Sequence, residues 1–311
     1  MVTPSRAPVA LVAAALLLVG GAAACTAGTD GPTSTGTTST GTGPAASAGP
    51  TNGTTGGPSG DLSGGPSAHA APADAADVRA RGTALTAGDV TLAVLPAPGT
   101  TLVVEAGPDG SALARLTPGA TAARSPVAWL AAPPDRSLVA EDDGTVVVTD
   151  AAGGFVAGVA APGTAPAADG TTSVPGPRGA GVVPGPDGTL AVMLPASPTS
   201  TAGTTPAELP LWLAATTVLD ARWGDREGGR SLAVTPSAWA RVGGAAAAEG
   251  VWAQLVAREP EAGTTSMHDQ LWCHQLGAPT KATWNLEPWR PEVDTLELLA
   301  AGCNPVEQGE G

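Results

Sequence analysis

The chain has 311 residues, a formal net charge of −14 at pH 7 and 42% hydrophobic residues. That length leaves room for one large or two small folded domains once flexible segments are set aside. The acidic balance excludes proteins that bind nucleic acid or anionic lipid through a basic surface.

Residues 1–24 are typical of a secretory signal peptide. One cation, Arg6, precedes an apolar run at residues 9–19 and a group of small residues, and the run is too short for a stable membrane span. The small residues before Cys25 resemble the end of a bacterial lipoprotein signal, although Ala22 stands where such signals usually carry Leu, Val or Ile. We expect a lipidated Cys25 that anchors the protein to the outer face of the cell membrane. Ordinary cleavage before a free Cys25, which gives a secreted protein, is the alternative.

Residues 25–80 predict a disordered tether. The segment consists mainly of Gly, Ser, Thr, Pro and Ala, with almost no large apolar side chain. This composition cannot bury enough surface to offset the conformational entropy lost on folding. A flexible chain of about 55 residues has a root-mean-square span of roughly 40 Å, so we expect a spacer that holds the folded part off the membrane.

Residues 81–205 predict a β-rich domain, either a sandwich or a partial propeller-like sheet. Short Val, Leu and Ala runs alternate with Gly, Pro and four Asp-Gly pairs, which supply the positive φ values of tight hairpins. Trp129 and Phe155 are expected in its core, and residues 160–177 are expected to form a loop. The predicted strands are residues 90–95, 101–105, 112–116, 137–141, 145–149, 154–159 and 190–194.

Residues 211–305 predict a small α+β domain, because seven of the eight Trp residues follow a Thr/Pro/Ala linker at residues 198–210. We place the domain boundary near residue 205. A hairpin is expected at Gly228-Gly229, and an Ala-rich helix is expected over residues 237–258 with Thr235 as its cap.

The last part of this domain contains one further strand and one further helix. Residues 269–276 alternate in a way that favours a strand with Gln270, Trp272 and His274 on one side. Residues 284–291 are expected to be extended and outside any sheet, because they contain two prolines. Residues 294–301 favour a short helix that ends at Gly302, and residues 306–311 form a tail.

Three groups of residues near the C-terminus resemble a known family, a C-terminal domain of unknown function in secreted and lipid-anchored actinobacterial proteins. The resemblance covers about residues 215–305 and implies no activity. The groups are Trp272-Cys273-His274, Lys281 with Trp284-Asn285-Leu286-Glu287-Pro288-Trp289-Arg290-Pro291, and Cys303-Asn304-Pro305.

Cys273 and Cys303 are expected to form a disulfide. Export favours oxidation, and lipidation of Cys25 leaves these two cysteines as a pair. Closing a loop of about 30 residues contributes on the order of 3–4 kcal/mol in the chain-entropy model. Metal binding by Cys273, His274 and Cys303 is the competing interpretation, but their spacing matches no zinc motif. We therefore expect no metal and no cofactor.

A hydrolase would use His274 as general base, Asp269 or Glu287 to orient it, and Ser231 or Ser266 as nucleophile. The chain has no Gly-x-Ser-x-Gly elbow. A histidine beside a half-cystine is more often a hydrogen-bonded structural residue. We therefore expect no catalytic activity and keep an extracellular hydrolase centred on His274 as the alternative.

Aromatic and polar side chains of the same segment suit recognition of a sugar or a peptide. The competing interpretation is that the tryptophans fill the core of a domain poor in Phe, Tyr and Ile. Glu287 and Arg290 are also expected to form an ion pair, with each other or with Lys281. We predict a lipid-anchored envelope protein that binds a wall glycan or an envelope protein, with a toxin-like effector as a third possibility. The candidate binding residues are Trp272, Lys281, Trp284, Asn285, Glu287, Trp289 and Arg290.

Overall fold

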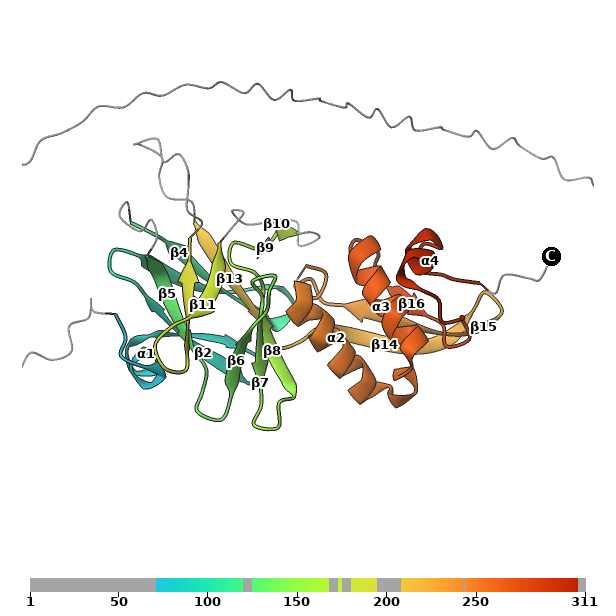
Figure 1. Ribbon diagram of the computed structural model, residues 1–311, viewed down its shortest axis with the longest axis horizontal. Coiled ribbons are helices and arrows are strands. Elements are labelled where there is room, and N and C mark those ends of the chain that lie inside the picture. The colour runs from blue at the N-terminus through green and yellow to red at the C-terminus, as the bar shows by residue number, and fades with distance from the viewer. Residues whose placement is uncertain are drawn as a thin grey trace, which may run out of the picture. The chain divides into compact units, whose positions relative to one another are not determined.

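The computed structural model describes residues 71–119, 125–167, 173–174, 180–194, 208–242 and 244–306. All of them belong to the unit that spans Leu62–Gly311. The predicted signal peptide, Cys25, most of the predicted tether and most of the tail lie outside the described residues. Within these limits the fold is mostly β with four α-helices, as predicted (Figure 1).

A five-stranded antiparallel sheet forms one layer, in the order β1-β2-β5-β12-β11. Helix α1 (Ala75–Arg81) packs on it through Val78, which contacts the cluster that contains Leu95 and Trp129. This helix lies partly in the predicted tether, so the folded part begins before residue 81. The strands are β1 (Thr83–Ala87), β2 (Val90–Pro96), β5 (Pro126–Ala131), β12 (Thr189–Met193) and β11 (Gly181–Pro184).

A six-stranded antiparallel sheet forms the second layer, in the order β3-β4-β13-β8-β7-β6. The main core takes Leu85, Val94 and Leu130 from the first sheet and Leu116 and Leu211 from the second. The N-terminal part is therefore a β-sandwich, one of the two predicted alternatives. The strands are β3 (Thr101–Ala106), β4 (Ala112–Thr117), β13 (Leu209–Ala214), β8 (Phe155–Val159), β7 (Val146–Thr149) and β6 (Ser137–Ala140).

The seven predicted strands are confirmed within a residue or two. Their turns use the predicted Asp-Gly pairs: Gly144 has φ 81° between β6 and β7, and Gly188 has φ 71° between β11 and β12. A short 3₁₀ turn, η1 (Pro108–Gly110), joins β3 to β4. The pair Asp169-Gly170 lies outside the described residues, and the predicted loop around it contains the paired strands β9 (Ala165–Pro166) and β10 (Ser173–Val174).

Two strands that the sequence analysis missed, β5 and β13, are buried on both faces, so neither shows the alternation that marks a half-exposed strand. The boundary near residue 205 also needs correction. Strand β13 pairs with β4 and β8, so the sandwich extends to Ala214. The outer face of β13 carries Trp212, which packs in a cluster with Trp239 and thereby joins the sandwich to the segment that follows the hairpin.

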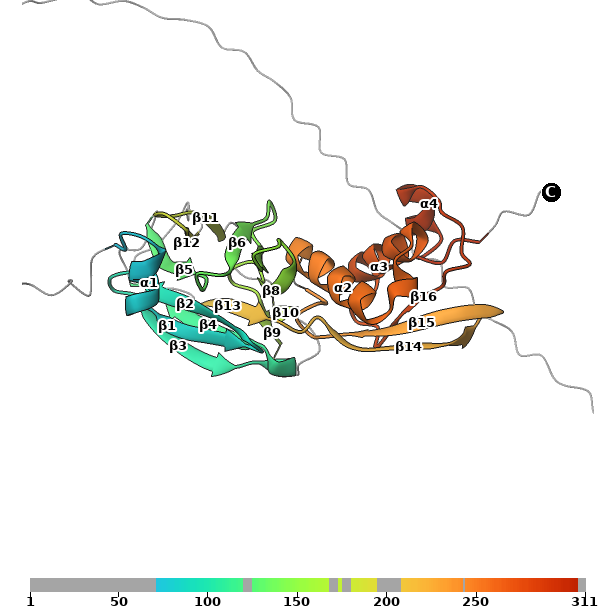
Figure 2. The same ribbon diagram turned by 90° about the horizontal axis from the view of Figure 1, so that it is seen from below.

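The C-terminal part is an α+β unit built on a three-stranded sheet in the order β14-β15-β16. Its core contains Val218, Leu232, Val251, Leu271 and Trp284. Figure 2 shows the helices covering one face of the long β14–β15 hairpin. The elements are β14 (Val218–Arg226), β15 (Gly229–Pro236), α2 (Gly244–Arg258), the 3₁₀ turn η2 (Pro260–Ala262), α3 (Thr265–Gly277), β16 (Trp284–Leu286) and α4 (Thr295–Ala300).

The Ala-rich helix begins later than predicted, and its cap comes from another part of the chain. Thr235 lies in β15, whereas α2 starts at Gly244. The carboxylate of Asp143, in the β6–β7 turn, accepts a hydrogen bond from the backbone N–H of Ala245 at 2.7 Å. Capping by a residue about 100 positions away leaves no local signal in the sequence.

The predicted strand at residues 269–276 is wrong, because this segment lies in helix α3. Thr264 caps the helix by accepting from the N–H of Met267. The buried residues Met267, Gln270, Leu271 and His274 follow the 0, 3, 4, 7 spacing of a helix face. Two of these four buried side chains are polar, and this concealed the helical period.

The predicted disulfide is confirmed. Cys273 on α3 and Cys303 after α4 are joined with their Cα atoms 5.5 Å apart. Both sulfurs are buried with Leu298 of α4, which is the predicted short helix ending at Gly302. The bridge therefore fixes the segment after α4 against α3. None of the described helices is long and apolar enough to cross a membrane.

Candidate functional site

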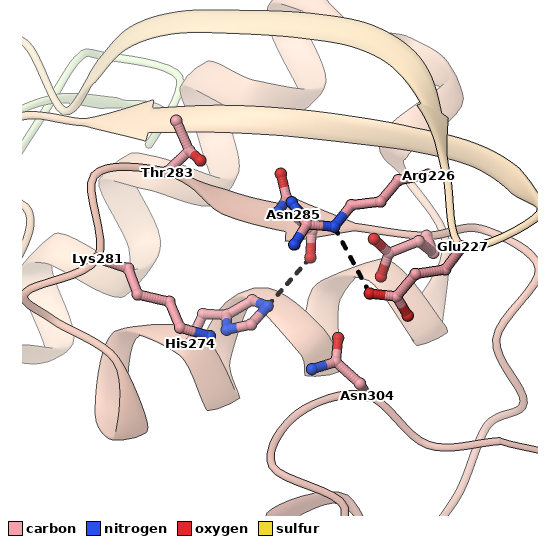
Figure 3. A pocket seen from close by; sticks show the side chains of 8 residues that line it. Arg226, Glu227, His274, Lys281, Thr283, Asn285 and Asn304 are labelled. Atoms are coloured by element: carbon pink, nitrogen blue, oxygen red, sulfur yellow. Dashed lines mark hydrogen bonds and ion pairs between the residues drawn. The ribbon is translucent and has the colours of Figure 1, made fainter. Parts of the chain in front are cut away.

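A small polar cavity of about 40 Å³ lies beside the tip of the β14–β15 hairpin. Residues from the hairpin tip, from α3, from the segment that leads into β16 and from the end of the disulfide loop meet there (Figure 3). The cavity therefore forms only when these four segments are held together. Its lining residues are Arg226, Glu227, His274, Lys281, Thr283, Asn285, Glu287 and Asn304.

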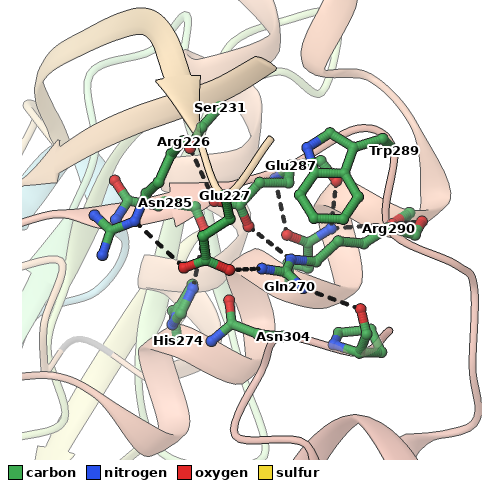
Figure 4. A network of polar contacts seen from close by, with 12 residues as sticks. Arg226, Glu227, Ser231, Gln270, His274, Asn285, Glu287, Trp289, Arg290 and Asn304 are labelled. Carbon is green, nitrogen blue, oxygen red and sulfur yellow. Dashed lines mark hydrogen bonds and ion pairs between the residues drawn. The ribbon is translucent and has the colours of Figure 1, made fainter. Parts of the chain in front are cut away.

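A buried ion pair fixes the base of the site. The Glu287 carboxylate accepts from Arg290 Nε at 2.9 Å, and both side chains are 1% exposed. The other Glu287 oxygen accepts from the Ser231 hydroxyl at 2.9 Å. Figure 4 shows these groups converging from β15, α3 and the segment after β16. The ion pair predicted from the three-residue spacing is confirmed.

Gln270 of α3 holds the same residue through its backbone. Its side-chain oxygen accepts from the Glu287 N–H, and its amide nitrogen donates to the Glu287 carbonyl, both at 2.9 Å. The remaining Arg290 nitrogens donate to the Pro305 carbonyl at 3.1 Å and to the Glu227 carboxylate at 2.6 Å. We call Ser231, Glu227, Gln270, Glu287, Arg290 and the Pro305 carbonyl the Glu287 network. It locks the hairpin tip, α3 and the C-terminal segment together.

The Glu287 network leaves neither Glu287 nor Arg290 free for a ligand. Each Glu287 oxygen has a partner, and so does each guanidinium nitrogen of Arg290. The hydrogen bond from Arg290 also holds the pKa of Glu227 below its usual value. Two of the predicted binding residues therefore serve mainly to position the others.

His274 is the buried titratable group of the cavity, with 2% of its surface exposed. Its Nε2 lies 3.0 Å from the Asn285 carbonyl oxygen. A carbonyl only accepts, so Nε2 carries the proton. Burial lowers the pKa of His274, and the nearby Lys281 and Arg290 charges act in the same direction. The ring is therefore neutral at pH 7, and its Nδ1 is an acceptor without a partner in the described part of the chain.

Lys281 is the single lysine of the chain and an exposed residue of the cavity wall. In Figure 3 its side chain extends toward the ring of His274. Within the described residues its ammonium group has no hydrogen bond or ion pair. The loop that carries it is held by Arg241, whose guanidinium donates to the carbonyls of Pro279, Lys281 and Ala282. Lys281 is thus a free cation on a fixed backbone.

The hydrolase candidates are not assembled into a catalytic group. Ser231 donates to Glu287, whereas Ser266 donates to the backbone carbonyl of Arg290 at 3.0 Å. Asp269 is half-buried and lies beside His268 rather than His274. None of the hydrogen bonds of the described residues joins His274 to a serine hydroxyl or to a carboxylate. The arrangement lacks the nucleophile–base contact that covalent catalysis requires.

The three candidate tryptophans do not form one platform. Trp284 is fully buried in the core beneath β16. Trp272 is 38% exposed but lines a separate groove with Leu276, because α3 is a helix rather than a strand. Trp289 is 42% exposed and stacks on Arg290, with its N–H donated to the Arg230 carbonyl at 3.1 Å. The prediction that the tryptophans fill the core is confirmed for Trp284, whereas Trp272 and Trp289 are exposed.

No group of three or more His, Cys, Asp or Glu side chains that could hold a metal ion occurs in the described ranges. Cys273 and Cys303 are consumed by their disulfide, so the alternative metal site that used both thiolates is wrong. Sequence reasoning missed Arg226, Glu227, Thr283 and Asn304 as cavity residues. The Gly228-Gly229 pair locates the hairpin tip, but nothing in the sequence places that tip beside β16.

Residues 218–306 match the family described as Protein of unknown function (DUF2599). This range begins at β14 and ends just after the disulfide, so it coincides with the C-terminal α+β unit and includes the whole cavity. The sandwich lies outside the match.

Similar proteins occur in mycobacteria. Uncharacterized protein Rv0477 of Mycobacterium tuberculosis is 46% identical over 93 residues, which are 27% of this chain and 61% of that protein. Uncharacterized protein ML2452 of Mycobacterium leprae is 38% identical over 81 residues, 25% of this chain and 60% of that protein. The chain therefore spans about three fifths of the length of these relatives. No solved structure matches the chain.

Proposed function

We propose that the protein is exported, is anchored by a lipid on Cys25 to the outer face of the cell membrane, and binds a wall glycan through its C-terminal α+β unit. The observation that carries the proposal is the buried Nδ1 of His274, a residue of the polar cavity, which has no hydrogen-bond partner among the described residues. Buried polar atoms normally have partners, and an exception indicates a ligand or a functional role. The cavity walls supply amide, hydroxyl and ammonium groups, which suit hydrogen bonding to a polar ligand.

Binding accounts for the site better than catalysis does. The carboxylates of the cavity are engaged in the Glu287 network, and His274 has no hydrogen bond to a nucleophile within the described ranges. The Cys273–Cys303 bridge supports export, because disulfides persist mainly in oxidising compartments. The composition of residues 1–24 supports a signal peptide, and Cys25 supplies the acceptor for a lipid.

Retention of the full chain on purified insoluble wall material tests the binding proposal. We expect Lys281→Met to lower the retained fraction, because it removes the ammonium group of the cavity. The variant should still fold, because this exposed ammonium group has no hydrogen bond or ion pair among the described residues. Arg222→Met is the matched control, since it removes an exposed cation outside the cavity. Equal retention of all three proteins, or no retention of any, contradicts the proposal. Retention on an envelope protein in place of the glycan assigns the site to a protein partner and refutes the glycan.

Intact mass of the protein recovered from membranes tests the anchor. The proposal predicts loss of residues 1–24 and addition of acyl groups at Cys25. Labelling of Cys25 by a thiol reagent in denaturant contradicts it, whatever the state of the other two cysteines.

A further inference from the structure

The cavity beside the hairpin tip has room for a single functional group. Its volume of about 40 Å³ compares with the roughly 10–15 Å³ that one water needs on the same measure. Two or three water-sized groups therefore fit, as in a hydroxymethyl group or one edge of a ring. A whole sugar ring or a side chain of a partner protein does not, so most of any ligand must lie outside.

The chemistry of the cavity restricts what that group can be. Nδ1 of His274 needs a hydrogen-bond donor, because Nε2 already carries the imidazole proton. A carboxylate or phosphate oxygen cannot satisfy it, since an ionised oxygen only accepts. A cationic group is also disfavoured, because Arg290 and Arg226 already engage the nearby carboxylates and Lys281 is a cation itself.

Other residues of the cavity supply donors. The Lys281 ammonium has three N–H groups and no partner among the residues that the structure describes. Thr283 and Asn285 add a hydroxyl and an amide at the same cavity, and both are partly exposed. The bound group must therefore donate to His274 and accept from Lys281 at the same time. A hydroxyl group does both, because its oxygen donates one hydrogen and accepts through two lone pairs.

We infer that this cavity recognises a neutral hydroxyl group of a saccharide, which donates its hydrogen to Nδ1 of His274 and accepts from the ammonium of Lys281. This inference rests on the proposed function and narrows it to the neutral, hydroxylated part of the glycan. The Glu287 network holds the backbone around the hydroxyl, and Asn285 fixes the histidine ring through its carbonyl.

The test is a titration of the full chain, with its disulfide intact, followed by the ¹⁵N signal of His274 Nδ1. The His274→Gln spectrum identifies that signal. The neutral probes are methyl β-glucoside and the methyl β-glycoside of N-acetylglucosamine, and the anionic probes are acetate and sulfate, whose ionised oxygens only accept. We expect a saturable shift of the Nδ1 signal with at least one neutral probe and none with the anions.

Lys281→Met should raise the dissociation constant for that probe about 10-fold or more, because a hydrogen bond from a charged donor is lost. Arg222→Met, which removes an exposed cation outside the cavity, should leave it unchanged. A saturable response to acetate or sulfate with protonation of Nδ1 overturns the inference in favour of an anion site. Absence of any response shows a cavity that holds water only, which also overturns it. If the wall preparation still retains the protein in that case, the binding proposal stands and only the ligand class fails.

Discussion

The Arg290 guanidinium and the Glu287 carboxylate meet 2.9 Å apart with both side chains 1% exposed, and the hairpin tip, α3 and the C-terminal segment converge on this pair. Two charges this deeply buried are stable only while each keeps its partners, because desolvation costs several kcal/mol per ion. The arrangement of the segments around the cavity therefore depends on the ion pair between Glu287 and Arg290. Neither charge of that pair is free to bind a ligand.

Removal of Arg290 should destabilise the C-terminal unit strongly. Arg290→Met leaves the Glu287 charge buried without its cation, and loss of one partner of such a pair costs about 3–5 kcal/mol. Arg222→Met is the control, because the pair of Arg222 with Asp220 is largely exposed and such pairs contribute about 0–1 kcal/mol. Urea unfolding monitored by tryptophan fluorescence measures both. Equal losses in the two variants would contradict the role given to the buried pair.

The disulfide should stabilise the same unit by fixing the segment after α4. In the chain-entropy model, a closed loop with a sequence separation of 30 contributes about 3–4 kcal/mol. The double variant Cys273→Ser and Cys303→Ser should lose about this much free energy of unfolding. The unchanged chain under reducing conditions should behave in the same way. A double variant as stable as the oxidised parent would show that the bridge is dispensable.

Stability should fall as the pH drops below about 6.5, and His274 should be the cause. Burial lowers the pKa of His274 in the folded protein, whereas the unfolded chain has the ordinary histidine value of about 6.5. The unfolded state therefore binds the proton first. Stability from the neutral ring is complete above about pH 6.5 and is lost as the pH falls toward the lower folded pKa.

Chemical unfolding between about pH 7.5 and pH 5.5 measures this effect, because the window spans the ordinary histidine pKa. His274→Gln should flatten the profile, whereas His268→Gln, which changes an exposed histidine six residues earlier, should not. The carboxylates whose pKa is lowered, Asp77, Asp143, Asp150 and Glu227, lose their contributions only at more acidic pH. An unchanged slope in His274→Gln would assign the pH dependence to other groups.

One added methyl group at Gly158 should destabilise the contact between the sandwich and the segment after the hairpin. A Cβ on Gly158 would lie 2.5 Å from Cη2 of Trp239, which is 1% exposed and donates its N–H to the Trp212 carbonyl. Gly158→Ala should cost about 1–3 kcal/mol through overpacking. Gly224→Ala on β14 is the control, because its Cβ would meet nothing within 4 Å. Similar thermal midpoints for the two variants would contradict the tight packing of Trp239.

Local patterns predicted seven strands of the sandwich, the Asp-Gly turns and the short helix before Gly302, because each depends on neighbouring residues, but they missed the partly exposed strands β1 and β11. Cysteine parity predicted the bridge between Cys273 and Cys303. The fully buried strands β5 and β13 have no alternation to detect. The cap of α2 comes from Asp143, far away in the chain.

Long-range contacts also explain what the site prediction missed. Gln270 and His274 lie on the buried face of α3, where the backbone of the segment that includes β16 hydrogen-bonds the Gln270 amide and the Nε2 of His274. A polar residue on a buried face disguises the helical period. The sequence identified His274, Lys281 and Asn285 as candidates. It could not place the hairpin tip beside them, because that neighbourhood depends on the contact between Glu227 and Arg290.

The account depends most on a neutral His274 whose Nδ1 is an unused acceptor. A long-range ¹H–¹⁵N correlation spectrum of the free protein at neutral pH measures the tautomer and the charge of this ring directly. The account predicts a proton on Nε2 and none on Nδ1. The second proton should bind only when the pH falls below the ordinary histidine pKa. A proton on Nδ1 with a bare Nε2, or a doubly protonated ring at pH 7, would contradict it.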